Sequence, residues 1–128
     1  MIVDASALIA ILLREPEKAR FRELIAHDVE PMMSPVNYLE AAVRADGLGK
    51  EMSSGFDELF GETGITIVPV DKKQARLARE AYARYGKGNH GAKLNLGDCF
   101  AYALAKARGE KLLFKGEDFR RTDVEAAL

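Results

Sequence analysis

The fold is decided by the opening stretch MIVDASALIAILL, residues 1–13. Residues 1–3 are a short apolar run that is typical of a buried strand, and Asp4 ends this run. Residues 6–13 are almost wholly apolar and predict a buried helix directly after the acid. A strand that passes at once into a helix begins the alternation on which α/β folds are built.

The rest of the chain repeats this alternation of strands and helices. Further strands are predicted at residues 32–33, 65–70 and 111–114, with a small edge strand at 122–124. Helices are predicted from Pro16 through the apolar positions 21, 24 and 25, and then at 36–45, 56–60, 72–85 and 98–108. Residues 86–95 form a loop rich in Gly, Asn and Lys. The pattern predicts a parallel sheet between helices, with ligands bound at the carboxyl ends of its strands.

Length and composition fit one globular domain that spans residues 1–128. Of the 128 residues, 48% are hydrophobic and 30% are charged, as in ordinary soluble domains. The single cysteine, Cys99, excludes a disulfide framework and favours the reducing cytoplasm. No apolar run reaches the roughly 20 residues of a membrane helix, and residues 1–4 lack the basic start of a signal peptide. We therefore expect a cytoplasmic protein without a membrane partner.

The net charge of −1 hides a strong polarity along the chain. Residues 1–71 carry 6 basic and 13 acidic residues, a net of −7, whereas residues 72–128 carry 13 basic and 7 acidic residues, a net of +6. The near-neutral total excludes binding of nucleic acid through bulk positive charge. A local basic surface remains compatible with it.

That basic surface is predicted within residues 72–95, whose net charge is +6. The candidate nucleic-acid-contacting residues there are Arg79, Arg84, Lys87 and Lys93, and a solvated helix surface is the alternative for each of them. Tyr82 and Tyr85 either stack on bases or cover the core.

Four carboxylates are predicted at strand ends or helix starts: Asp4, Glu40, Asp98 and Asp118. Asp4 and Asp98 each have the alternative role of a helix cap. Asp118 has the alternative role of a solvated turn residue.

Glu40 is the most informative of these acids, because it shares a helical face with Val36, Leu39 and Val43. It therefore projects from an apolar face or from its margin. A charge there is costly unless it pairs, binds a metal or extends to water.

All four acids fall on the side of the sheet where α/β folds bind ligands. Clustered carboxylates repel one another and need a cation or raised pKa values. A set of oxygen ligands suits a hard ion such as Mg²⁺, with Mn²⁺ as the alternative. Such an ion activates water and stabilises charge on a phosphoryl centre.

These acids lie within motifs that carry a family resemblance over nearly the whole chain. The chain resembles the PIN-domain ribonucleases of the VapC toxin type. The matching stretches, in the family's order, are MIVDASAL at 1–8, NYLE at 37–40, LNLGDCFAYA at 94–103 and LFKGEDF at 113–119 followed by TDV at 122–124.

The resemblance implies a PIN-like three-layer α/β/α fold and a Mg²⁺-dependent endoribonuclease, the toxin of a type II toxin–antitoxin pair. It implies Asp4 and Asp98 as the main metal ligands, with Glu40 and Asp118 completing the acidic site. Glu117 and Asp123 stand near Asp118 as competing candidates for the fourth acid. Ser6 and Asn37 are implied as supporting residues.

The resemblance also implies partners. These are an RNA substrate, with tRNA as the usual class and other structured RNA as the alternative, and a VapB-like antitoxin that covers the acidic groove. A homodimer is expected, and contact with operator DNA is expected only through the antitoxin. The apolar stretches 8–13 and 21–25 form either core or a surface for a second copy or the antitoxin.

Two other classes of function compete with this interpretation. A metal-dependent phosphatase or phosphotransferase with an aspartyl nucleophile also begins with an acid at a strand end. The haloacid-dehalogenase-like enzymes carry a second Asp two residues later, where this chain has Ser6. A non-catalytic PIN-like binding module would have no need of four placed acids.

Overall fold

The computed structural model describes residues 1–88 and 91–128. Within these residues one sheet is formed by four two-residue strands: β1 (Ile2–Val3), β2 (Met32–Met33), β3 (Thr66–Ile67) and β4 (Leu112–Leu113). The strand order is β3-β2-β1-β4 and every pairing is parallel. The predicted parallel sheet is therefore confirmed.

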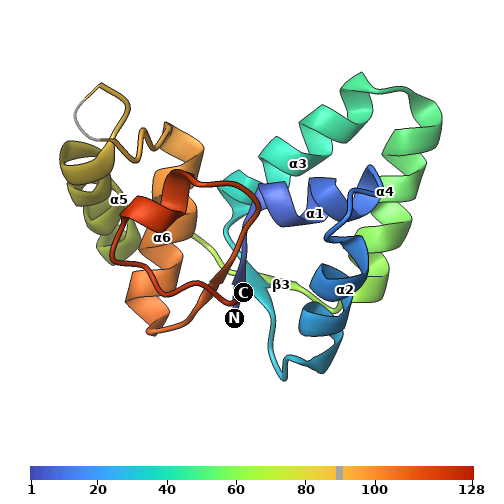
Figure 1. The fold of residues 1–128 in the computed structure, drawn as a ribbon, viewed down its shortest axis with the longest axis horizontal. Helices are drawn as coiled ribbons and strands as arrows, with labels where there is room; N and C mark the ends of the chain where they lie inside the picture. The colour runs from blue at the N-terminus through green and yellow to red at the C-terminus, as the bar shows by residue number, and fades with distance from the viewer. Residues whose placement is uncertain (89–90) are drawn as a thin grey trace.

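Six α-helices and one short 3-10 helix surround the sheet in the described part of the chain. They are α1 (Ala5–Leu12), α2 (Lys18–His27), α3 (Pro35–Gly47), α4 (Lys50–Thr63), α5 (Lys72–Tyr85), α6 (Leu96–Arg108) and η1 (Asp118–Arg121). Figure 1 shows α5 and α6 on one side of the sheet and α1 to α4 on the other.

Strands β1, β2 and β4 each contribute one side chain to each layer, because successive residues of a strand point to opposite faces. Ile2, Met32 and Leu112 pack in the core beneath α5 and α6. Their neighbours Val3, Met33 and Leu113 pack in the second core, against α1 to α4. Two buried cores separated by a parallel sheet confirm the three-layer α/β/α fold.

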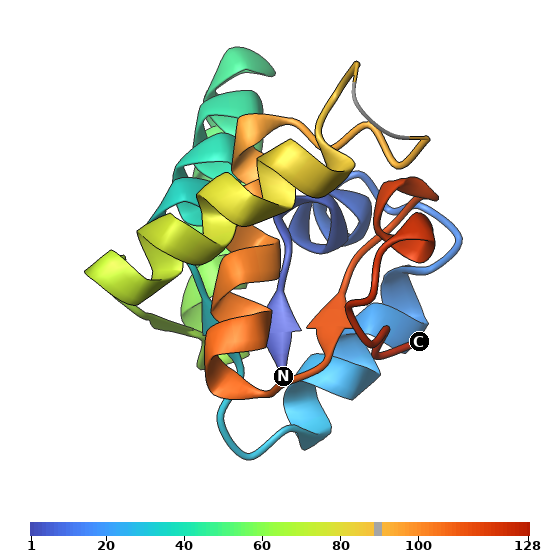
Figure 2. The same ribbon diagram turned by 90° about the vertical axis from the view of Figure 1, so that its left-hand side faces the viewer.

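The sheet also fixes where Asp4 lies. The Asp4 backbone N–H donates to the Leu113 carbonyl at 2.9 Å, so Asp4 lies where the ends of β1 and β4 meet. In Figure 2 α1 begins just beyond the tip of β1, while α6 runs alongside the strand. The carboxyl end of β1 is thus enclosed by helix starts.

Three predicted elements differ from the structure in extent. Pro16 precedes Glu17, which occupies the N-cap position of α2, so Pro16 lies in the connecting turn and not in the helix. The helix predicted at 56–60 is the 14-residue α4. The strand predicted at 65–70 is reduced to the exposed β3, since an edge strand pairs on one side only.

The edge strand predicted at 122–124 is wrong. Thr122 Oγ1 donates to the Phe119 carbonyl at 2.7 Å and accepts from the Val124 N–H at 3.3 Å, which turns the chain at this point. Pairing with β4 occurs later, as an isolated bridge between Leu112 and Ala126.

The apolar stretches 8–13 and 21–25 mainly form core. Leu8, Ile9, Ile11, Phe21 and Ile25 are all at most 4% exposed and pack in the layer of α1 to α4. Across residues 1–88 and 91–128, every helix is too short or too polar to cross a membrane.

Candidate functional site

An acid pocket of about 280 Å³ opens at the carboxyl end of β1. It is lined by residues from α1, α3 and the start of α6: Asp4, Ala5, Ser6, Ile9, Glu40, Arg44, Asn95 and Asp98. Three of the four predicted acids therefore come together in one hollow, from positions up to 94 residues apart in the chain.

Asp4 is the deepest of these acids, with 4% of its surface exposed. Its Oδ2 accepts from the Ser6 N–H at 3.1 Å and from the Ser6 hydroxyl at 2.6 Å, so Asp4 caps α1 and Ser6 supports it. Its Oδ1 is buried and has no hydrogen-bond donor within residues 1–88 and 91–128. Burial raises the pKa of Asp4, the bonds from Ser6 oppose this, and the charge of Asp118 adds to it.

Glu40 does not project from a buried apolar face, and that part of the prediction is wrong. The buried positions of α3 are Asn37, Ala41 and Ala45, whereas Leu39 is 60% and Val43 is 58% exposed. Helix α3 packs through small residues spaced four apart, so its larger apolar side chains point to solvent. Glu40 stands between these two faces, at the rim of the acid pocket.

The Glu40 carboxylate is oriented by the fully buried Asn37. The Asn37 Nδ2 donates to Glu40 Oε1 and to the Gly97 carbonyl, both at 2.9 Å, and so joins α3 to the start of α6. A Cβ at Gly97 would overlap the Glu40 carboxylate. Partial burial raises the pKa of Glu40, the bond from Asn37 opposes this, and the charge of Asp4 adds to it.

Asp98 is half-buried and has two roles at once. It closes a capping box, because its Oδ2 accepts from the Asn95 N–H at 3.0 Å while its own N–H donates to Asn95 Oδ1 at 2.8 Å. Burial raises the pKa of Asp98 to about 7, helped by the charges of Asp4, Asp118 and Glu40 and opposed by the bond from Asn95. Capping and membership of the acid pocket are therefore compatible.

The structure distinguishes two of the three candidates for the fourth acid, Asp118 and Asp123. Asp118 is exposed at the start of η1 and lies outside the pocket lining, but its charge raises the pKa of Asp4 and of Asp98. Asp123 accepts from the Tyr102 hydroxyl at 2.5 Å and from Lys106 Nζ at 3.1 Å, and these contacts lower its pKa. Since Asp123 is neutralised elsewhere, Asp118 stays the stronger candidate.

The predicted RNA-contacting residues are not part of the acid pocket's lining. Arg79 lines a separate apolar hollow of about 480 Å³ together with Tyr82. The Arg84 guanidinium stacks over the Tyr85 ring at 4.9 Å and lies 3.9 Å from Asp123. Tyr85 is 4% exposed and belongs to the core, which excludes it as a stacking platform.

Lys87 and Lys93 are both exposed and flank a segment of the predicted basic loop, residues 89 and 90, that lies outside the described residues. Sequence reasoning missed two members of the site, Arg44 and Gly97. Arg44 follows Glu40 by one helical turn, a spacing that would have found it.

The donor chemistry of the acid pocket fits a hard divalent cation. The buried Asp4 Oδ1 has no hydrogen-bond partner in the described chain, and a carboxylate oxygen is the kind of donor that a hard cation prefers. No three His, Cys, Asp or Glu side chains in that same part of the chain are arranged as a complete metal site. Mg²⁺ does not require one, because it binds through one or two carboxylates and keeps several waters.

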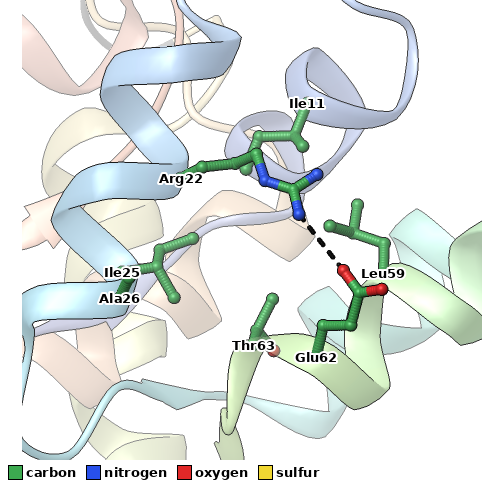
Figure 3. Close-up of a pocket in the computed structure, with 7 residues that line it drawn as sticks. All are labelled: Ile11, Arg22, Ile25, Ala26, Leu59, Glu62 and Thr63. Atoms are coloured by element: carbon green, nitrogen blue, oxygen red, sulfur yellow. Dashed lines mark hydrogen bonds and ion pairs between the residues drawn. The ribbon is translucent and has the colours of Figure 1, made fainter.

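A second hollow, of about 90 Å³, lies between α1, α2 and α4. Figure 3 shows Arg22 reaching across it to Glu62, with Nη2 to Oε2 at 3.1 Å. Its other lining residues are Ile11, Ile25, Ala26, Leu59 and Thr63, none of them titratable. It shares no residue with the acid pocket.

Comparison with known proteins shows the family of the chain by sequence and its fold by structure. Residues 1–125 match the PIN domain family. The chain is 47% identical over 127 residues to the Ribonuclease VapC of Mycolicibacterium smegmatis, with 98% of each chain covered. It is 44% identical to Ribonuclease VapC30 of Mycobacterium tuberculosis, over 97% of this chain and 95% of that one.

Solved structures share the fold at lower identity. The crystal structure of Mycobacterium tuberculosis VapC20, a sarcin-ricin loop cleaving toxin, matches with a TM-score of 0.76 and 16% identity over 96% of this chain and 95% of that one. VapBC2 of Rickettsia felis, bound to a DNA fragment from its promoter, matches with a TM-score of 0.73 and 14% identity over 98% and 94%.

Proposed function

The chain belongs to the PIN domain family and is a ribonuclease toxin of the VapC type, and from this premise we propose that the acid pocket is its RNA-cleaving site. Its reaction is hydrolysis of RNA phosphodiester bonds with Mg²⁺ or Mn²⁺. The match over residues 1–125 supports treating residues 1–128 as a single PIN domain.

The observation that carries the proposal is the clustering of the pocket acids around one buried carboxylate oxygen that has no donor. Asp4 keeps one buried oxygen without a donor in the described chain, and the pKa of Asp98 is raised to about 7. A fold gains nothing from burying like charges together, so such a group is expected where a cation binds.

The residues have distinct roles in this proposal. Asp4 and Asp98 hold the cation, and Asp118 adds negative charge at the rim. Glu40, held by Asn37, orients the attacking water or takes its proton. Ser6 fixes Asp4 through the two bonds to Oδ2, which leaves Oδ1 for the cation. When bound, the divalent ion supplies an activated water and charge neutralisation at the phosphoryl group.

Substrate binding needs positive charge, because the pocket itself repels a phosphodiester. Arg44 brings a guanidinium to the pocket and makes no ion pair within residues 1–88 and 91–128, so we assign it to the phosphate next to the cleaved bond. Arg79, Arg84, Lys87 and Lys93 then contact more distant phosphates of a tRNA or other structured RNA.

The partners follow from the toxin assignment. Toxin–antitoxin complexes of the same fold support an antitoxin partner. In our proposal this antitoxin is VapB-like, covers the acid pocket and is the part of the complex that contacts operator DNA. The exposed side chains of Leu39, Val43 and Leu96 support a homodimer. A chain with one buried cysteine and an RNA substrate fits the reducing cytoplasm.

The test is cleavage of RNA by the purified chain without its antitoxin. Total RNA is incubated with Mg²⁺ or with EDTA, and the new ends are mapped by sequencing. We expect discrete cuts that need Mg²⁺ and vanish in Asp98→Asn, while Asp123→Asn, the matched carboxylate outside the pocket, cuts as the wild type does. Equal cutting by Asp98→Asn would contradict the proposal.

A further inference from the structure

Lys115 lies just beyond β4, in the turn that leads to Asp118 and η1. Its side chain reaches the turn between α1 and α2, where its ammonium group pairs with Glu15 and lies 3.0 Å from Glu17 Oε2. The three side chains are 36%, 30% and 33% exposed, so this cluster, which we call the lysine clamp, is partly shielded from solvent.

The same residue also touches the acid pocket through its backbone. The Lys115 N–H donates to Ser6 Oγ at 3.0 Å, and Ser6 Oγ donates its only proton to Asp4 Oδ2 at 2.6 Å. A hydroxyl has one proton and two lone pairs. With an N–H fixed on one lone pair, the Ser6 proton is directed to Asp4.

The clamp and that N–H belong to the same turn. Lys115 precedes Gly116, whose φ of 105° gives the turn a shape that other residues rarely adopt. The turn lies outside β4 and η1, so the ion pairs to Glu15 and Glu17 tie it to the neighbouring α1–α2 connection. The carboxylates of Glu15 and Glu17 would repel each other at this separation. The positive charge of Lys115 between them offsets that repulsion.

We propose that Lys115 is a positioning residue for the acid pocket. The lysine clamp holds the turn so that the Lys115 backbone N–H orients the Ser6 hydroxyl. Ser6 then bonds only Oδ2 of Asp4, which leaves Asp4 Oδ1 free for the divalent cation. The inference rests on the proposed function, since it presumes that Asp4 binds the cation. It extends the site to Glu15 and Glu17, which lie outside the pocket lining.

The test is Mn²⁺ binding to the free protein by calorimetry, without RNA. Partners that orient a metal ligand are worth about 10- to 100-fold in affinity, so Lys115→Met is expected to weaken Mn²⁺ binding about tenfold. Lys111→Met is the matched control, because Lys111 lies at the other end of β4 and pairs with Glu125 at 3.5 Å. It is expected to bind Mn²⁺ as the wild type does.

A double-mutant cycle separates positioning from general stabilisation. If Lys115 acts through Ser6, then Ser6→Ala/Lys115→Met binds Mn²⁺ no more weakly than Ser6→Ala alone. Additive losses, or wild-type affinity in Lys115→Met, would overturn the proposal. If Lys115→Met does not fold, Glu15→Gln/Glu17→Gln takes its place, and wild-type Mn²⁺ affinity in that variant would overturn it equally.

The result also distinguishes this inference from the proposed function. A wild-type chain that binds no Mn²⁺ contradicts the metal-dependent site itself. A wild type that binds Mn²⁺ with a Lys115→Met variant of equal affinity contradicts only the role of Lys115.

Discussion

Two groups of acids sit around the same helix, α6, and their surroundings are opposite. Asp98, at the start of the helix, faces Asp4 and Glu40, and its pKa is raised to about 7. Asp123, which packs against Tyr102 and Lys106 of the same helix, receives bonds from both, and its pKa is lowered. The protein pairs Asp123 with its own hydrogen-bond donors. In the cluster of Asp98, Asp4 and Glu40 it leaves one buried oxygen, Asp4 Oδ1, without a donor in the described chain. This difference separates a structural carboxylate from a functional one better than residue type or position in the sequence does.

The largest expected effect comes from exchanging one carboxylate in each group for its amide. Asp98→Asn should lower RNA cleavage by at least about 100-fold, because even residues behind a metal ligand are worth 10- to 100-fold. Asp123→Asn should cleave RNA at a rate within about twofold of the wild-type rate. Initial rates of RNA cleavage at saturating Mg²⁺ measure the effect of both substitutions. Equal losses in the two variants would contradict the distinction between a functional Asp98 and a structural Asp123.

Gly97→Ala should lower cleavage about tenfold with little change in stability. The added methyl group overlaps the end of the flexible Glu40 side chain, which moves away and loses its bond to Asn37. Gly61→Ala is the control, since that position has open space around it. A Gly97→Ala variant with the wild-type kcat would exclude a precise placement of Glu40.

Arg44→Ala should raise KM for RNA about fivefold while leaving Mn²⁺ binding unchanged. The loss of one phosphate contact should also reduce the slope of log affinity against log salt by nearly one. Arg14→Ala, on an arginine outside the acid pocket, is the control. An unchanged KM in Arg44→Ala would place the substrate phosphate elsewhere.

For Asp123 and its partners Tyr102 and Lys106, we expect substitution to change the stability of the protein and not its activity. Asp123→Asn should lower the free energy of unfolding by about 1 kcal/mol at pH 7, because it weakens charged bonds from Tyr102 and Lys106 at a half-exposed site. Urea denaturation measures it. An unfolding midpoint equal to that of the wild type would show that this network contributes nothing.

The two groups should also respond to pH with opposite signs, and this is the smallest effect. The pKa of Asp98 is raised, so its contribution to stability without metal is full below pH 3.8 and is lost as pH rises to about 7. The pKa of Asp123 is lowered, so its contribution is present above pH 3.8 and is lost as pH falls further.

Urea unfolding in EDTA between pH 4 and 8, with the wild type compared with Asp98→Asn, checks the first of these slopes. The wild type should lose stability relative to the variant as pH rises. Parallel curves would contradict the raised pKa.

Much of this architecture could be predicted from the sequence, because it depends on local patterns. The alternation of short apolar runs and helices predicted the parallel sheet, and the helix predicted at 72–85 is α5 with the same bounds. The meeting of Asp4, Glu40 and Asp98 was also expected, since strand ends and helix starts converge at one edge of a parallel sheet.

What could not be predicted depends on packing between distant segments. The exposed face of α3 was misread because Leu39 and Val43 look like core residues until Ala41 and Ala45 are seen to make the contact. The contact of Gly97 with Glu40 and the reach of Lys115 to Glu15 join residues 57 and 100 positions apart, and no local pattern marks either of them.

The central claim, that the clustered acids of the pocket bind a divalent cation, is tested most directly by titrating Mn²⁺ into the metal-free protein at pH 6.5. Calorimetry in buffers of different ionisation enthalpy counts the protons released on binding. With the pKa of Asp98 at about 7, binding should release protons, because a cation displaces them from the carboxyl groups. Both the binding and the release should disappear in Asp98→Asn and persist in Asp123→Asn. Binding of equal strength in Asp98→Asn, or binding without proton release in the wild type, would contradict the account.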